Sequence, residues 1–379
     1  MTTDKLPQEQ IDHILNLFKS DQTQQALDFI DTLSKDYPDE SLLFNIRGAC
    51  YAGLGQLDIA VQSYKKALSI KPDYAKAHYN LGGALQELDK LHDSAKSYEN
   101  AIALEPENAQ AHNNLAIVLR ELDQLEEAEA SCRKAIVLDP EYAEAHSFLS
   151  IILYANGDLN SALESIKKAY SINPKLKIIK LLLAVLKARK THKTSKVSIS
   201  NIRSISNPLI LNRAVEQELI TKLYEIKSLE LEKTKDPSYG NARGSGYQLF
   251  QDDHSSIIKT VEEDLVRILR EAIKADIHIK DSFFTILGAG GGVNRHNHIS
   301  ALDIDSSLNL VNQKFSLVYY LSVGDQDCTE PGILKLYDPS ENILPREGMI
   351  IIFPADRHHS VVYNGKKDRV IIGINFYSL

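Results

Sequence analysis

Cysteines, long apolar runs and excess basic charge are all scarce in this 379-residue sequence, and each scarcity excludes a class of protein. The three cysteines, Cys50, Cys132 and Cys328, are too few and too far apart for a disulfide framework or a thiolate zinc cluster. No run of about 18 apolar residues occurs, which excludes a membrane-spanning helix. The 43 basic and 51 acidic residues give a net charge of −8, so we expect neither nucleic-acid nor membrane-surface partners.

Location and domain number follow from the same inventory. Few cysteines indicate a reducing compartment, and residues 1–10 are polar and lack the apolar core of a signal peptide. We therefore expect a cytoplasmic protein. At roughly 150 residues per domain, the length predicts two to three domains.

The first half of the chain repeats every 34 residues. Prolines, alanines and histidines form ladders with this spacing: Pro38, Pro72, Pro106, Pro140 and Pro174; Ala67, Ala101, Ala135 and Ala169; His78, His112 and His146. A helix–turn–helix pattern with this period resembles the tetratricopeptide repeat family. The resemblance covers residues 7–174 in five units. It implies an all-α solenoid, which we expect over residues 1–190, and the apolar-faced, Lys-rich run at 176–189 predicts a helix that caps it.

In that family the first helix of each unit lines a groove that binds extended peptides. The resemblance places four residues at the groove-facing position: Asn45, Tyr79, Asn113 and Ser147. We therefore expect a protein or peptide partner there, although these could also be ordinary solvated positions. The histidine ladder invites a metal interpretation, but its members lie on separate units at helix-packing distances of roughly 10 Å. We favour a structural role for it.

The second half of the sequence lacks the 34-residue repeat and has a different residue pattern. Residues 191–207 are rich in Ser, Lys and Asn and predict a linker, and a second domain is predicted over 208–379. Helical patterns at 213–226 and 257–275 flank a loop at 236–246. Short β-rich runs then follow at 283–287, 315–323, 333–337, 349–353, 360–363 and 370–377. Several short strands separated by turn signals are typical of a sandwich, barrel or jelly roll.

Histidines cluster in this second half. His296 and His298 are two residues apart, so on an extended segment they point to the same side and could meet one ion. His358 and His359 are adjacent, so only one of them is expected to face inward. Arg369 follows His359 by ten residues and opens the last apolar run.

These residues, together with Tyr-Tyr-Leu (319–321), Gly-Ile-Leu-Lys-Leu-Tyr-Asp-Pro (332–339) and Pro-Arg-Glu-Gly-Met-Ile-Ile-Ile-Phe-Pro (345–354), resemble the iron(II)- and 2-oxoglutarate-dependent oxygenases, closest to their prolyl-hydroxylase-like branch. The resemblance covers 281–379 and implies a double-stranded β-helix, or jelly roll. It makes His296 and His359 iron ligands. Arg369 would hold the remote carboxylate of 2-oxoglutarate, with help from Tyr319 or Tyr320.

The sequence departs from that family where its third ligand, a carboxylate, is expected, because His298 stands there. Three hypotheses follow: His298 is itself a ligand, Asp303 or Asp305 supplies the carboxylate, or the site is degenerate and holds little metal. The leading prediction is a dioxygenase that hydroxylates a protein or peptide recruited by the repeats. The alternatives are a non-enzymatic adaptor and a three-histidine, cupin-like dioxygenase that does not use 2-oxoglutarate.

Overall fold

The computed structural model describes residues 6–20, 22–194, 207–231, 237–246, 248–300, 302–305 and 308–379. Its internal contacts divide the chain into two units, Met1–Ile179 and Lys180–Leu379, which are described separately. We expected the first domain to extend to residue 190 and a linker to follow at 191–207. Instead, helix α11 (Lys177–Thr194) runs past 190 and belongs mainly to the second unit by contact. The rest of the expected linker, 195–206, lies outside the described residues.

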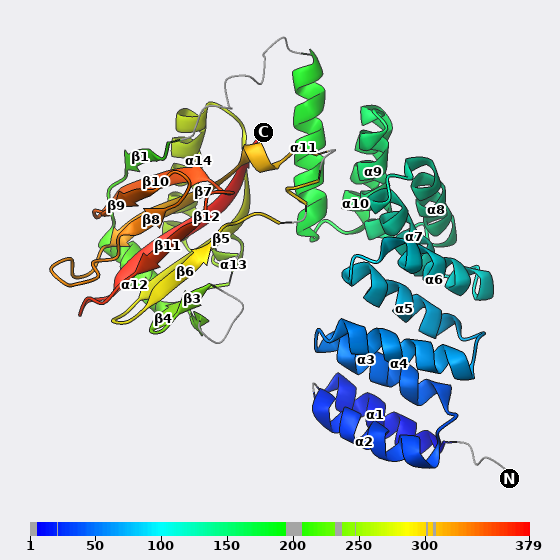
Figure 1. The fold of residues 1–379 in the computed structure, drawn as a ribbon. Helices are drawn as coiled ribbons and strands as arrows, with labels where there is room; N and C mark the ends of the chain where they lie inside the picture. The colour runs from blue at the N-terminus through cyan, green and yellow to red at the C-terminus, as the bar shows by residue number, and fades with distance from the viewer. Residues whose placement is uncertain are drawn as a thin grey trace. The chain divides into compact units, whose positions relative to one another are not determined.

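The first unit is all-helical in its described part, and Figure 1 shows its helices stacked in pairs. The pairs are α1 (Gln8–Lys19) with α2 (Thr23–Asp36), α3 (Ser41–Gly53) with α4 (Leu57–Ile70), α5 (Ala75–Glu87) with α6 (Leu91–Leu104), α7 (Ala109–Glu121) with α8 (Leu125–Leu138), and α9 (Ala143–Ala155) with α10 (Leu159–Ile172). Each proline of the ladder stands two residues beyond the end of an even-numbered helix, where a residue without an amide hydrogen stops the helix. The predicted repeat solenoid is confirmed.

Small residues let the two helices of a pair approach closely. A Cβ atom built on Gly48 would lie 2.5 Å from the ring of Tyr64, and one on Gly82 would lie 2.9 Å from Tyr98. One repeat later, the equivalent positions hold the fully buried Ala116 and Cys132, so a larger residue on one helix is matched by a smaller one on the other.

The histidine ladder is structural. In each of three repeats, the imidazole Nε2 of His78, His112 or His146 lies 3.0 Å from the carbonyl oxygen of the proline six residues earlier, in the turn between repeats. The bond ties the first helix of one repeat to the end of the preceding one. These histidines belong to no group of potential metal ligands in the described chain.

The expected groove residues require a correction. Asn45, Asn113 and Ser147 are only 4–6% exposed, so they lie between helices and do not form an accessible lining. Tyr79 alone of the four is half-buried. Hydrogen bonds join some of these residues to the following repeat. Asn80 donates to Asn45 Oδ1 at 3.0 Å, and Asn114 donates to the Tyr79 hydroxyl at 3.0 Å.

The second unit contains two antiparallel sheets, which do not close on themselves in the described residues. The first has the strand order β1 (Leu209–Asn212), β10 (Met349–Pro354), β7 (Lys314–Ser322), β12 (Arg369–Ser378), β5 (Ile277–Leu287), β4 (Ala242–Gly244) and β2 (Leu229–Glu230). The second has the order β3 (Ser238–Tyr239), β6 (Gly292–His296), β11 (His359–Val362), β8 (Leu334–Leu336) and β9 (Glu341–Ile343). The predicted β-rich character of this half is confirmed.

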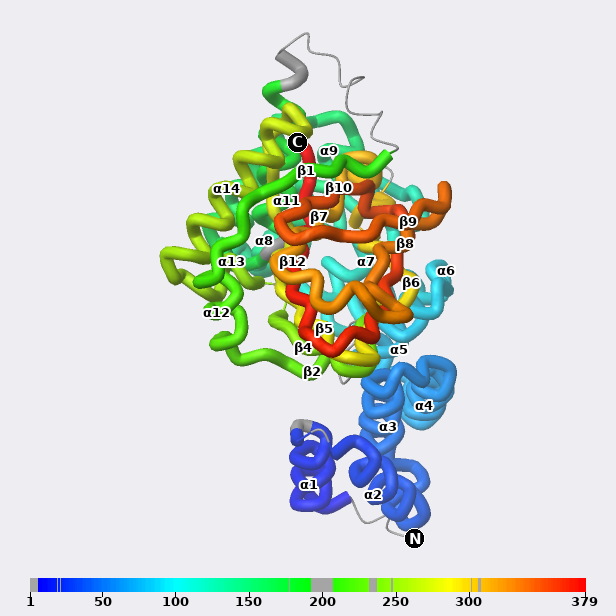
Figure 2. The backbone as a smooth tube through the Cα atoms, turned by 90° about the vertical axis from the view of Figure 1, so that its left-hand side faces the viewer, coloured from blue at the N-terminus to red at the C-terminus, as the bar shows by residue number. Residues whose placement is uncertain are grey.

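The seven-stranded sheet is buried on both faces. Alternate side chains of its strands, such as Leu317 and Ile372, pack against the helices α12 (Gln217–Glu225), α13 (Leu249–Asp252) and α14 (Ser256–Ile273). Figure 2 shows these helices along one side of the sheet. The opposite face, with Tyr320 and Ile351, packs against the five-stranded sheet through Leu336. Within the described residues, no helix combines the length and apolar character that a membrane crossing requires.

Candidate metal centre

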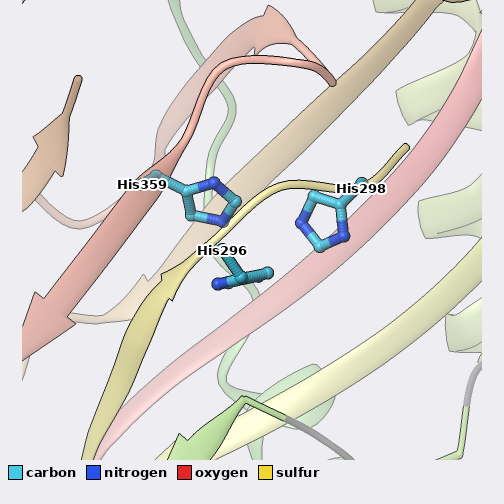
Figure 3. A group of neighbouring side chains, drawn as sticks. All are labelled: His296, His298 and His359. Atoms are coloured by element: carbon cyan, nitrogen blue, oxygen red, sulfur yellow. The ribbon is translucent and has the colours of Figure 1, made fainter. Parts of the chain in front are cut away.

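The three predicted ligand histidines converge between the two sheets. His296 ends β6 and His359 begins β11, and the two are paired in register as antiparallel neighbours. His298 lies two residues past the end of β6, and its ring centroid is 4.8 Å from that of His296. Figure 3 shows the three imidazoles gathered together. One ring nitrogen from each lies within 4.8 Å of the others, a spacing that a single metal ion can bridge.

Hydrogen bonds orient two of these rings. The Nδ1 atom of His296 lies 2.8 Å from the Asn294 carbonyl oxygen, and Nδ1 of His359 lies 3.4 Å from the Arg357 carbonyl oxygen. Ligand histidines commonly bond a backbone carbonyl with one ring nitrogen and coordinate with the other. The neighbouring His358 is half-buried, lies 3.5 Å from the Asn297 amide nitrogen and is not part of the cluster.

Burial keeps two of the imidazoles, His298 and His359, in the neutral form that binds a metal. It holds the pKa of His298 well below its usual range and lowers the pKa of His359 to about 3. The neighbouring imidazoles act in the same direction, because a second positive charge nearby disfavours protonation. His298 and His359 are therefore neutral nitrogen donors at neutral pH.

A buried arginine shares this cavity. Arg369, at the start of β12, is 1% exposed, and its guanidinium donates to the Gly332 carbonyl and lies 4.8 Å from the ring centre of Tyr320. No carboxylate in the described part of the chain lies within ion-pair distance of it. Its Nε atom is buried without a hydrogen-bond partner. A charge so poorly compensated is expensive to bury, which favours an anionic ligand for it.

The structure separates the two tyrosines that the sequence left open. Tyr320 lines the cavity beside Arg369. Tyr319 points to the helix side of the sheet, where its hydroxyl donates to the Ala214 carbonyl at 2.7 Å and accepts from Arg213 at 3.0 Å. Tyr319 is therefore corrected from a cosubstrate candidate to a structural residue.

Neither aspartate completes the histidine cluster. The Asp303 carboxylate is fully buried and bonds Lys314, Ser300 and the Tyr377 hydroxyl. These hydrogen bonds outweigh the effect of burial and hold its pKa below the usual range. Asp305 Oδ1 instead accepts from the Leu308 amide at 3.3 Å. The prediction that one of them supplies the missing carboxylate is therefore corrected, because neither joins the group of potential ligands around the histidines.

The cavity is otherwise largely apolar. Its walls include Val318, Leu334, Val361 and Ile371, with Ser316 and Asn375 as a hydrogen-bonded polar pair at 2.9 Å. No aspartate or glutamate is among its described lining residues. Three imidazole donors and one guanidinium cation in an apolar cavity can hold a transition metal and an anion together.

Ser316, Asn375 and Lys314 were not identified from the sequence as residues in or beside the site. Ser316 and Asn375 interrupt apolar strands on the cavity side, and that interruption was a signal that could have found them. Lys314 carried no such signal, because a lysine at the start of a strand is ordinarily a surface residue.

Family models match three stretches of the first unit. Residues 48–89 match a family model described as TPR repeat, and residues 79–143 and 143–176 match two models described as tetratricopeptide repeat. A 67-residue segment is 31% identical to a peroxisomal targeting signal receptor of Candida glabrata; it covers 18% of this chain but only 11% of that protein.

Solved structures of low identity also resemble part of the chain. MamA is 22% identical and covers 42% of this chain and 94% of its own, with a TM-score of 0.40. YrrB, described as a TPR protein with an unusual peptide-binding site, is 21% identical and covers 50% of this chain and 93% of its own, with a TM-score of 0.42. The three matching models, the helix pairs and the 34-residue proline ladder together identify the first unit as a tetratricopeptide repeat array.

Proposed function

We propose that the second unit is an iron(II)- and 2-oxoglutarate-dependent dioxygenase, and that it hydroxylates a protein or peptide recruited by the repeat array. The observation that carries the proposal is one cavity lined by three imidazoles and by a buried arginine that lacks a carboxylate partner. The two sheets around that cavity would be the two halves of a double-stranded β-helix.

The donor set fits iron(II). Imidazole suits iron among the first-row metals, and a site with three protein ligands leaves further positions open for other molecules. The Nδ1 atoms of His296 and His359 face backbone carbonyl oxygens, so each ring can coordinate a metal ion through Nε2. His298 would replace the usual carboxylate, so the bound metal would be one charge more positive than in an ordinary site of this family.

Arg369 fits the remote carboxylate of 2-oxoglutarate. A guanidinium grips a carboxylate through two parallel hydrogen bonds, and the unpartnered Nε of Arg369 has a donor to offer. The Tyr320 ring packs against the guanidinium and restricts its position. In this proposal an anionic cosubstrate supplies the negative counter-charge for Arg369 that the described part of the protein does not.

When bound, iron(II) and 2-oxoglutarate supply the oxidation of a C–H bond by O₂, with 2-oxoglutarate converted to succinate and CO₂. The protein's own residues bind and orient these groups. Three histidines fix the metal, Arg369 fixes the cosubstrate, and apolar side chains such as Val318 and Val361 exclude water from the reacting atoms.

The array would bring the substrate to the second unit. Tetratricopeptide repeats are protein-binding elements, and a macromolecular substrate would explain why a repeat array and the second unit occur in one chain. Because Asn45, Asn113 and Ser147 are buried, we assign recognition to more accessible first-helix residues, among them Tyr79 and Asn114.

The third histidine favours a second candidate, a three-histidine dioxygenase that does not use 2-oxoglutarate. Such an enzyme has no need of a buried, unpaired arginine beside its metal, so Arg369 weighs against it. A non-enzymatic adaptor would need neither feature.

Adding iron(II) and then 2-oxoglutarate to the full chain without oxygen separates these candidates. The leading proposal expects a visible charge-transfer band that appears only with both additions. His359→Ala should abolish the band, and Arg369→Met should shift its appearance to higher 2-oxoglutarate concentration. Iron binding without a band would favour the second candidate, and no iron binding would favour the adaptor.

A further inference from the structure

A fully buried ion pair lies next to the histidine cluster and has no part in the proposed reaction. The Lys314 ammonium and the Asp303 carboxylate are 2.7 Å apart, with side chains 1% and 0% exposed. Asp303 Oδ2 also accepts from the Ser300 amide at 2.7 Å and from its hydroxyl at 2.6 Å, and Oδ1 accepts from the Tyr377 hydroxyl at 2.6 Å. Burying two charges is costly, so a pair this completely satisfied calls for a role.

The pair contacts the backbone of one histidine. Lys314 Nζ donates to the His298 carbonyl as well as to Asp303. On the other side, the His298 amide donates to the Ala355 carbonyl at 2.9 Å, and the Ala355 amide donates to the Lys314 carbonyl at 3.0 Å. Lys314 therefore holds His298 directly through its side chain and indirectly through Ala355.

His298 needs such support more than its two partners do. His296 and His359 lie within paired strands, where the sheet register fixes their backbones. His298 lies beyond the end of β6, outside any strand. Its position therefore depends on contacts that the sheet does not supply.

We propose that Lys314 and Asp303 are positioning residues that hold the His298 imidazole where it can bind a metal ion. Lys314 fixes the His298 carbonyl, Asp303 fixes the Lys314 ammonium, and Tyr377 and Ser300 fix the Asp303 carboxylate. The inference rests on the metal centre of the proposed function, but not on 2-oxoglutarate or on catalysis.

Binding of Co²⁺ alone to the full chain tests this inference, with the visible absorption of the bound ion as the readout. Lys314→Met removes the ammonium at similar length. Loss of a partner that supports a metal ligand commonly lowers metal affinity 10- to 100-fold. We expect a loss of that size, together with a spectrum that shifts towards that of His298→Ala.

Two comparisons separate positioning from general destabilisation. Arg213→Met disrupts another buried ionic group of the same unit, on the helix side of the sheet, and should leave the Co²⁺ spectrum and affinity unchanged. In a His298→Ala background, adding Lys314→Met should change Co²⁺ affinity by less than about twofold, because the supported ligand is already gone. Should Lys314→Met not fold, Tyr377→Phe removes one hydrogen bond to Asp303 and should lower the affinity in the same direction.

The outcomes are distinct. The positioning role would be overturned, and the metal centre left intact, if wild-type protein bound Co²⁺ and a folded variant bound it with the same affinity and spectrum. Lys314→Met is that variant, or Tyr377→Phe if Lys314→Met does not fold. An equal loss of affinity with and without His298 would also overturn it. Wild-type protein that binds no Co²⁺ would overturn the metal centre itself, and the inference with it.

Discussion

Replacing Arg369 with methionine removes the guanidinium while keeping an apolar side chain of similar length in the cavity. The side chain is 1% exposed, so solvent screens its interactions little. A hydrogen bond to a charged group contributes roughly 1.5–3 kcal/mol, which corresponds to about 10- to 150-fold in a dissociation constant. We therefore expect Arg369→Met to weaken 2-oxoglutarate binding by that factor.

The stability of the ligand-free protein should change much less. Methionine removes a buried charge that has no carboxylate partner, which is favourable. It also leaves the Gly332 carbonyl without its donor, which is unfavourable by a similar amount. We expect the free energy of unfolding to stay within about 1 kcal/mol of wild type, so a loss of 2-oxoglutarate affinity cannot be attributed to misfolding.

Calorimetric titration of manganese-loaded protein with 2-oxoglutarate measures the effect. Arg213→Met is a matched control, because the Arg213 side chain is also only 7% exposed but bonds Glu216 and Asp264 on the helix side of the sheet. The control should bind 2-oxoglutarate as wild type does. Equal affinity of Arg369→Met and wild type would refute the anchor role of Arg369.

Three further predictions address the metal, pH and the repeat array. His296→Ala and His359→Ala should each lower manganese affinity at least tenfold in equilibrium dialysis, whereas His358→Ala should not; equal losses in all three would contradict the cluster. Metal-free protein should lose stability as pH falls below about 6.5, because the unfolded chain accepts protons that folded His298 and His359 do not. Each site should contribute up to about 1.4 kcal/mol per pH unit, and His359→Gln should flatten this slope in denaturant titrations between about pH 7 and pH 5. In the array, Gly48→Ala should lower the melting temperature, because its Cβ would overlap the Tyr64 ring. Gly83→Ala should raise the melting temperature, since the nearest atom to its Cβ is 3.5 Å away and alanine favours the helix. The reverse order of melting temperatures would count against the packing argument.

The repeat array could be predicted from the sequence almost completely. A solenoid repeats its contacts, so the same proline, alanine and histidine positions recur and reveal the period. What the period did not reveal was side-chain accessibility. Asn45 and Asn113 read as polar groove residues, yet both are buried, and Asn45 accepts a hydrogen bond from Asn80 of the next repeat.

The second unit was harder to predict, because its contacts join residues distant in sequence. The six β-rich runs correspond to parts of β5, β7, β8, β10, β11 and β12, but the short strands β1 to β4, β6 and β9 were not expected. The candidate ligands were found because His296 and His298 are two residues apart and because His359 matches the family resemblance. The roles of Asp303 and Lys314 could not be found, since nothing in the sequence marks these two residues, 11 positions apart, as a buried ion pair.

Succinate production from 2-oxoglutarate tests the central proposal most directly. The assay supplies the full chain with iron(II), 2-oxoglutarate, O₂ and cell extract as a source of protein substrates, with His359→Ala as the matched control. The proposal predicts succinate formation that needs iron(II) and exceeds that of His359→Ala by at least tenfold. Succinate formation equal to that of His359→Ala, by wild-type protein that binds both iron(II) and 2-oxoglutarate, would contradict it.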